Sequence, residues 1–477
     1  MKRYFFVMVI IFACLLYIPT YNHYFFSDDF FNIKVSKLAH LSEFPAFFSF
    51  QKNAHSTTFY RPLSTQLFFF SLEKSFGLNP IPYRIVVLLV FALNLWLVYK
   101  LSFALTTNHQ ISLLCLFFYG FTASHFVRIY YLSAFCEILV SVFFLAAAIK
   151  WLSYLTHRSG SIKTLISAII FFILALFSKE TAVTFPAIAL GIIFITKKTK
   201  YLISLIPFIV IDVIYLILRL KVFGGVVGDS YIWEISPKII NTFSWYTAWS
   251  LGIPEMFLDF IGPKLHINPN LLLWYPIYSR VIFVTFCSLI IFISVLLIKY
   301  FFSRQKRISL LIGSICWFVI TLVPVLFLPW HKFPLEQTIA MFGMALLLSL
   351  LFTSLKSKAL LLLGLTTYLI LNITSYLLTY KTNWTISRAK IAQKVISRVT
   401  QDYPSLPLQT TIYFQNDSAY IAKNWGASKQ IAVALSGSDS FQLIYRHPSL
   451  EIYYEDNKKP DENIKVIKYG TKEFLGY

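Results

Sequence analysis

Residues 1–30 read MKRYFFVMVIIFACLLYIPTYNHYFFSDDF. The basic pair Lys2-Arg3 precedes an apolar run from Tyr4 to about Tyr21, which is long enough to cross ~30 Å of hydrocarbon. No small-residue cleavage site follows, so we predict a retained helix with its N-terminus in the cytoplasm. Two adjacent carboxylates, Asp28 and Asp29, come directly after this helix.

The composition indicates a membrane protein. Of 477 residues, 57% are hydrophobic and only 13% are charged, which excludes soluble enzymes, disordered chains and secreted disulfide scaffolds. The net charge of +21 comes from Lys and Arg that mostly flank apolar runs, so we expect no nucleic-acid partner. The five cysteines stand singly inside apolar segments, without the spacing of a zinc site.

Further apolar runs of membrane-spanning length follow the first one. They begin near Ile85, Ile111, Leu132, Thr164, Ala182, Tyr201, Val281, Ser309, Thr338 and Ala359. We therefore predict an α-helical polytopic membrane protein with about 11 transmembrane helices, a large first external loop and a small C-terminal external α/β domain. The apolar segment Ile239–Ile261 contains Gly252 and Pro254, so it is predicted to be a membrane-surface helix.

The orientation follows from the basic residues. With the N-terminus inside, four cationic clusters fall on the inner side and the C-terminus is outside. These clusters are Lys150/Arg158/Lys163, Lys197/Lys198/Lys200, Arg304/Lys306/Arg307 and Lys356/Lys358. The absence of a eukaryotic targeting or retention string favours a bacterial cytoplasmic membrane.

The predicted transmembrane domain covers residues 1–380, with large external loops at 22–83 and 221–280. Residues 381–477 form the predicted external domain, because the composition becomes polar there. An amphipathic helix is expected around Trp384, Ile391, Val395 and Val399, and a strand at Thr411–Phe414.

The acidic pair is the sharpest chemical signal. Carboxylates at the outer membrane surface are costly unless they are used. One can accept the proton of a hydroxyl, while its neighbour orients it or helps to hold a divalent cation such as Mg or Mn. The alternative interpretation is a pair of carboxylates that cap a helix.

Several cations are predicted at the same surface. Arg61, in Tyr60-Arg61-Pro62-Leu63, suits a phosphate, although it could instead extend to the interface beside Tyr60. Lys179 and Glu180 occupy a short external turn, either as site residues or as an internal ion pair. The last external turn, Trp330–Glu336, offers His331 or Lys332 to a phosphate.

Other ionisable residues have mainly structural interpretations. His125, Arg128 and Glu137 converge on the outer face, where Glu137 could simply pair with Arg128 or His125. Asp212 is the only acid expected near the bilayer centre. An intramembrane acid often marks function, but its depth favours a hydrogen bond between packed helices.

The order of these motifs resembles the GT-C superfamily of membrane glycosyltransferases, most of all the branch related to protein O-mannosyltransferases. The resemblance covers roughly residues 1–200. It rests on the acidic pair, the YRPL segment, Gly77-Leu78-Asn79-Pro80 with Tyr83-Arg84 and Asn94, His125 with Glu137, and Ser178-Lys179-Glu180-Thr181 with Pro186. Unlike the relatives with tetratricopeptide repeats, this chain has no such array after its last span.

The resemblance implies that residues 1–380 are a catalytic domain of the cell envelope. It would transfer a hexosyl or pentosyl group from a polyprenyl-monophosphate carrier to a glycan, lipid or protein acceptor on the outer face, with inversion. Asp28 would be the base and Asp29 its companion, or both would be metal ligands. Arg61, Lys179 and Lys332 would bind the donor phosphate, supported by His125, Arg128, Glu137 and Glu180. The alternative is a multi-span transporter or lipid flippase, suggested by the many spans and Asp212.

Overall fold

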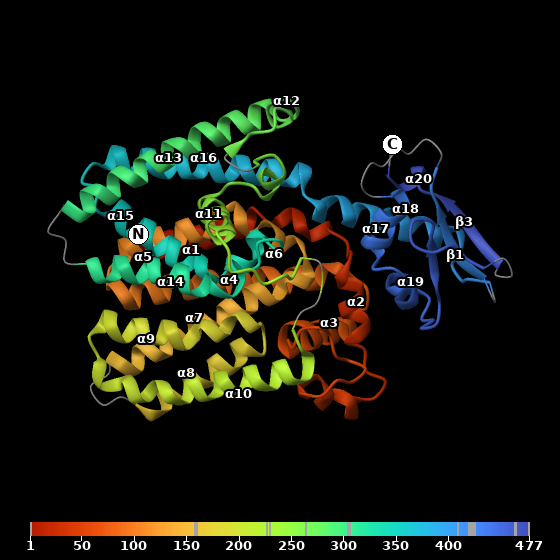
Figure 1. Ribbon diagram of the computed structural model, residues 1–477, viewed down its shortest axis with the longest axis horizontal. Helices are drawn as coiled ribbons and strands as arrows, with labels where there is room; N and C mark the ends of the chain where they lie inside the picture. Colours follow the sequence, from red (N-terminus) through yellow and green to blue (C-terminus); the bar gives the residue numbers. More distant parts are fainter. Residues whose placement is uncertain are drawn as a thin grey trace.

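The computed structural model describes residues 2–156, 161–225, 228, 230–262, 265–302, 307–407, 410–417, 426–461 and 465–475. Of the cationic clusters, Arg158, Arg304 and Lys306 lie outside these residues. Most of the chain is helical, and long helices lie side by side in a bundle with a smaller α/β unit at one end (Figure 1).

Each predicted apolar run falls on a helix of this bundle. These helices are α1 (Lys2–Leu15), α4 (Pro80–Thr106), α5 (His109–Gly120), α7 (Phe135–Thr156), α8 (Ile162–Leu176), α9 (Phe185–Thr196), α10 (Ile206–Phe223), α13 (Pro276–Phe302), α14 (Ile308–Leu326), α15 (Ala340–Thr353) and α16 (Lys358–Thr382). Their side chains are predominantly apolar, as expected for helices in contact with lipid and with each other.

Among the described residues, seven helices are long and apolar enough to cross a membrane. An eighth candidate is a pair bent by 52°, formed by α5 and residues Ala123–Tyr130, which include α6 (Phe126–Tyr130). Helices α8 and α15 and the segment Glu180–Thr196 are apolar but shorter. The polytopic helical architecture is therefore confirmed, while about 11 crossings and the orientation of the termini stay predictions.

The first large loop folds against one end of the bundle. It contains α2 (Asp28–Val35), α3 (Phe68–Phe76) and helical turns at Leu41–Phe48 and Pro62–Leu67. The buried guanidinium of Arg84, on α4, ties this loop to the α6 region. It donates hydrogen bonds to the carbonyl oxygens of His23 and Tyr24 on one side and of Ile129 and Tyr130 on the other.

The second large loop contains α11 (Lys238–Leu251), a turn at Glu255–Asp259 and α12 (Asn270–Trp274). Helix α11 ends at Gly252, whose φ of +116° suits glycine and stops the helix as the sequence predicts. With 14 residues α11 is not among the candidate spans of the described chain.

The C-terminal unit has a parallel sheet of the order β2-β1-β3. Its strands are β1 (Thr410–Gln415), β2 (Ile452–Tyr454) and β3 (Lys465–Gly470), and its helices are α17 (Trp384–Asp402), α18 (Ala427–Leu435), α19 (Asp439–Ile444) and α20 (Lys472–Leu475). The predicted amphipathic helix and strand are confirmed as α17 and β1. The domain boundary at residue 381 stays a prediction.

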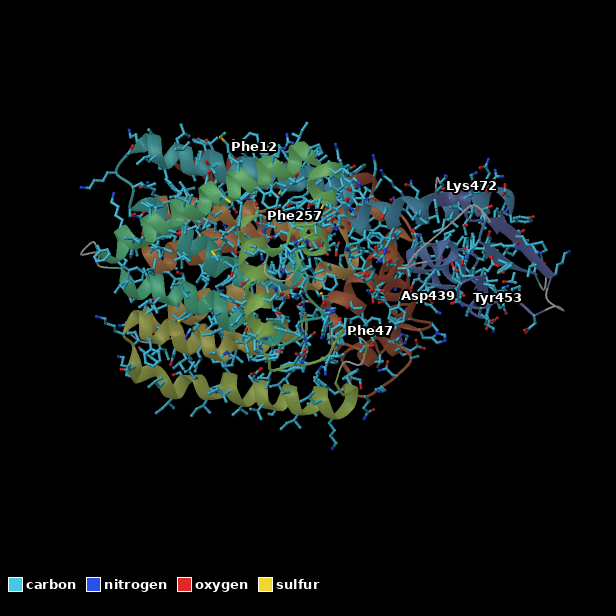
Figure 2. All side chains as sticks on the ribbon, turned by 45° about the horizontal axis from the view of Figure 1, so that its top comes forward. Phe12, Phe47, Phe257, Asp439, Tyr453 and Lys472 are labelled. Atoms are coloured by element: carbon cyan, nitrogen blue, oxygen red, sulfur yellow. The ribbon has the colours of Figure 1, made fainter. Side chains whose placement is uncertain are left out.

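This unit packs against the helix that carries the acidic pair. The amide of Ser27 donates to the carbonyl of Ala434 over 2.8 Å, and the ammonium of Lys34 lies 2.8 Å from the Asp439 carboxylate. Figure 2 shows Asp439 where the C-terminal unit meets the end of the helix bundle. The position of α2 thus depends on the C-terminal unit as well as on the helix bundle.

Substituting Gly252 by alanine should destabilise the fold. An added Cβ would lie 2.3 Å from the Asn372 Oδ1 atom, which accepts a hydrogen bond from the amide of Ala123. We expect Gly252→Ala to lower the free energy of unfolding by about 2 kcal/mol, seen as a lower Tm in detergent. Gly191→Ala is the control, because nothing lies within 4 Å of that Cβ and α9 gains helix propensity. Equal Tm values for the two variants would contradict this packing.

Candidate active site

A cavity of about 640 Å³ opens at the end of the bundle near α2 and α17. Its walls carry ionisable side chains from widely separated parts of the chain. Among these are Asp28, Arg61, Glu137, Lys179, Glu336 and Arg388. The structure therefore brings together four of the predicted site residues, Asp28, Arg61, Lys179 and Glu137, which are up to 151 positions apart in the sequence.

The two acids of the pair have different surroundings. Asp28 is exposed to the cavity, and its Oδ2 atom accepts a hydrogen bond of 2.7 Å from the Tyr131 hydroxyl. Asp29 is fully buried: Oδ1 accepts bonds from the amide and hydroxyl of Ser133, and Oδ2 accepts one from the amide of Phe26. Burial raises the pKa of Asp29 to about 6, although the Arg84 charge and these hydrogen bonds oppose it. Asp29 fixes α2, and Asp28 is available for chemistry.

An ion cluster forms another wall of the cavity. The buried ammonium of Lys179 contacts the carboxylates of Glu137 and Glu336, the latter over 2.5 Å. Beside it, the Arg61 guanidinium binds Glu180 through two hydrogen bonds of 2.9 and 2.6 Å. Buried ion pairs thus join four segments of the chain: the first loop, α7, the turn at Lys179 and Glu180, and the last loop.

The partners in this cluster determine its protonation. Burial by itself lowers the pKa of Lys179, but the carboxylates of Glu137 and Glu336 outweigh it and hold that pKa above its usual value. For Glu336, burial raises the pKa, yet the Lys179 charge and hydrogen bonds from His331 and Lys179 bring it below its ordinary value. Lys179 and Glu336 therefore remain a charged pair at neutral pH.

Five predicted site residues do not line the cavity: Asp29, His125, Arg128, Glu180 and Lys332. Lys332 donates instead to the Oδ1 atom of Asn241, 2.8 Å away on α11. Arg128 is buried and donates to the Nδ1 atom of His125 and to the carbonyl of Pro334. Arg128 thereby connects the bent α5–α6 segment to the last loop.

Two acidic residues, Glu137 and Glu180, form ion pairs with partners other than those expected from the sequence. Glu137 binds Lys179 rather than Arg128 or His125, and Glu180 binds Arg61 rather than Lys179. Asp212 makes no hydrogen bond to any described residue, so the predicted bond between packed helices is wrong. The partners observed for Glu137 and Glu180 are distant from them in the sequence, so only the tertiary fold brings them together.

Several polar residues of the cavity wall are not predicted from the sequence, among them Tyr131, Glu255, Glu336 and Arg388. Glu336 could have been found, because it lies in the turn already selected for His331 and Lys332. Arg388 could not, since it follows Asp28 by 360 positions on a helix that reads only as amphipathic.

The acidic pair does not form a set of metal ligands. Both Asp29 oxygens already accept hydrogen bonds, and its side chain is 0% exposed. Within the described part of the chain, no group of three or more His, Cys, Asp and Glu side chains could hold a metal ion. Asp28 and Asp29 as joint ligands of Mg or Mn thus do not fit this arrangement.

No protein-family profile matches the chain, and no curated protein sequence does either. The apo crystal structure of ArnT from Cupriavidus metallidurans matches 94% of this chain and 85% of its own, with a TM-score of 0.51 at 10% sequence identity. ArnT is a GT-C glycosyltransferase, and the fold of this chain is similar to that of ArnT. The predicted GT-C resemblance is thereby confirmed at the level of fold.

Two further structures with lower TM-scores are similar to the chain. ArnT bound to undecaprenyl phosphate matches 94% of it with a TM-score of 0.47 at 12% identity, over 85% of that protein. The Archaeoglobus fulgidus oligosaccharyltransferase, in complex with Zn and sulfate, matches 89% of it with a TM-score of 0.46 at 13% identity. The chain spans about three fifths of that oligosaccharyltransferase, 61% of its length.

Removing the central cation of this buried ion cluster should strongly destabilise the fold. Lys179→Met leaves Glu137 and Glu336 buried without their partner, so we expect the free energy of unfolding to fall by about 3 kcal/mol or more. Lys37→Met is the matched control, because Lys37 pairs with Glu73 at the surface, and such pairs contribute below about 1 kcal/mol. Denaturant unfolding of both variants in detergent measures the difference. A Lys179→Met loss no larger than that of Lys37→Met would contradict a buried ion cluster.

Proposed function

We propose that this protein is an inverting glycosyltransferase that moves a sugar from a polyprenyl-monophosphate carrier to an acceptor on the outer face of the membrane. The observation that carries the proposal is one cavity that joins an exposed carboxylate, Asp28, to the cations Arg61 and Lys179 within a GT-C fold. The fold alone does not specify a reaction, so the argument rests on this site.

Asp28 has the properties of a general base. Its Oδ2 atom is oriented by the Tyr131 hydroxyl, and Oδ1 has no hydrogen-bond partner within the described chain. In the reaction, the acceptor oxygen attacks the anomeric carbon while its proton passes to Asp28. The bond between that carbon and the phosphate oxygen breaks, and its electron pair leaves with the phosphate. Asp29 supports this role by fixing α2.

The cations suit the leaving phosphate, on which negative charge grows as the bond breaks. The Nη1 atom of Arg61 has only a weak contact of 3.5 Å with the Cys136 sulfur, so it can still donate to a phosphate oxygen. Lys179 has a third ammonium proton beyond its two carboxylate partners. The Nε2 atom of His331 lies 3.8 Å from the Glu336 carboxylate at the edge of this cluster.

The proposed membrane orientation agrees with the distribution of charge. The loops with Lys197, Lys198, Arg307 and Lys356 lie at the end of the bundle away from α2 and the C-terminal unit (Figure 1). Basic residues favour the cytoplasmic side. This supports a cavity and C-terminus on the outer face and an N-terminus inside. We propose a bacterial cytoplasmic membrane as the location on the sequence argument alone.

Substituting the base tests the proposal. Wild type and Asp28→Asn in nanodiscs would be offered a panel of polyprenyl-monophosphate sugars together with envelope glycans, lipids and peptides as acceptors. Mass spectrometry follows loss of sugar from the carrier. We expect one donor to be consumed by the wild type and Asp28→Asn to be slower by about 100-fold or more, because the proton acceptor is lost.

Asp259→Asn is the matched control. Asp259 is an exposed acid of the second external loop that does not line the cavity, and its substitution should leave the rate unchanged. Both variants must elute as folded protein in size exclusion. Equal rates for Asp28→Asn and the wild type would remove Asp28 as the base, and flux of a lipid or solute without sugar transfer would favour the transporter or flippase.

A further inference from the structure

A second opening reaches Asp28 from the side of the C-terminal unit. It is a groove of about 340 Å³, and it shares Asp28, Tyr131 and Arg388 with the larger cavity. Its remaining wall comes from Ser27 and from Ala432, Val433, Ser436, Gly437 and Asn457 of the C-terminal unit. The carboxylate of Asp28 therefore lies where two cavities meet.

One wall of the groove holds an unsatisfied polar atom. Ser27 is only 5% exposed, and its Oγ atom has no hydrogen-bond partner among the described residues. Its backbone is fixed at φ 50°, a conformation unusual for a serine, and its amide is bound to the carbonyl of Ala434. A buried hydroxyl without a partner is rare in proteins, and a ligand with a polar group in the groove would supply the missing bond.

The groove is polar, and its cation is Arg388. Tyr131 is the aromatic residue among its described lining residues, and Ser27, Ser436 and Asn457 supply hydroxyl and amide groups. Arg388 is held with its guanidinium 4.7 Å from the ring centre of Trp384. A guanidinium remains charged at every accessible pH and binds phosphate oxygens through paired N–H groups.

Inversion requires the acceptor oxygen and the leaving phosphate on opposite faces of the sugar. If the large cavity holds the donor, the acceptor must reach Asp28 by another route. The groove supplies such a route, because most of its lining residues belong to the C-terminal unit.

We propose that the groove is the acceptor site, and that it takes a hydroxyl carried by a polar molecule with a phosphate group nearby. Arg388 binds the phosphate, Ser27 Oγ binds the hydroxyl, and Asp28 removes the hydroxyl proton as the new bond to the anomeric carbon forms. This assignment rests on the proposed transferase function and adds the chemical class of its acceptor.

Binding in the absence of any donor tests the site independently of transfer. The probes are glycerol 3-phosphate and glycerol, measured by saturation-transfer NMR with the full-length protein in nanodiscs. We expect glycerol 3-phosphate to bind and glycerol to bind more weakly. Arg388→Gln should weaken glycerol 3-phosphate by about tenfold, because charged hydrogen bonds are lost.

A blocking variant locates the bound probe. Asn457 is an exposed turn residue on the groove wall, so Asn457→Trp should abolish binding by filling the space without disturbing the core. Lys459→Trp adds the same ring two residues away, outside the groove lining, and should bind the probe like the wild type.

Two results would overturn the acceptor site. Binding that survives in Asn457→Trp would mean that the phosphate sits elsewhere, for example in the large cavity. Equal binding of glycerol and glycerol 3-phosphate would refute the phosphate-bearing class. A different result would refute the transferase function alone. In that case no donor sugar would be consumed, while Asn457→Trp would still abolish binding of the probe.

Discussion

The buried ammonium of Lys179 between the carboxylates of Glu137 and Glu336 is the constraint on which the site depends. It joins α7, the short turn after α8 and the last loop between α14 and α15. A charge taken out of water is stable only with such partners, so these segments cannot separate without a large loss of free energy. The neighbouring Arg61–Glu180 pair attaches the first loop to the same point.

The two acids of the pair have different roles: Asp29 is structural, and Asp28 is the proposed catalytic base. Both carboxylate oxygens of Asp29 accept hydrogen bonds from Ser133 or Phe26, and these bonds fix the start of α2. Asp28, one residue earlier, is left exposed between two cavities. Because Ser27 and Lys34 are bound by Ala434 and Asp439, the C-terminal unit helps to set the position of this carboxylate. That unit is thereby connected to the proposed reaction through α2 as well as through Arg388.

The sequence predicts those structural features that depend on a local pattern of residues. Runs of apolar residues predict the helices of the bundle, Gly252 predicts the end of α11, and spacing predicts α17. It also predicts that Asp28, Arg61 and Lys179 share a surface. It does not predict ion-pair partners, since Glu137 lies near Arg128 in the chain but near Lys179 in space. Nor does it predict that the Nζ atom of Lys332 binds Asn241 on α11, because only the fold creates this contact.

The central claim is that the carrier phosphate binds in the cavity beside Asp28. The most direct measurement is an electron cryomicroscopy structure of the wild type in nanodiscs with a polyprenyl monophosphate. The account predicts density for the phosphate within hydrogen-bonding distance of Arg61 and Lys179, with Asp28 facing the sugar position. Phosphate density on Lys332 or among the intramembrane helices near Asp212, with the cavity lacking it, would contradict the account.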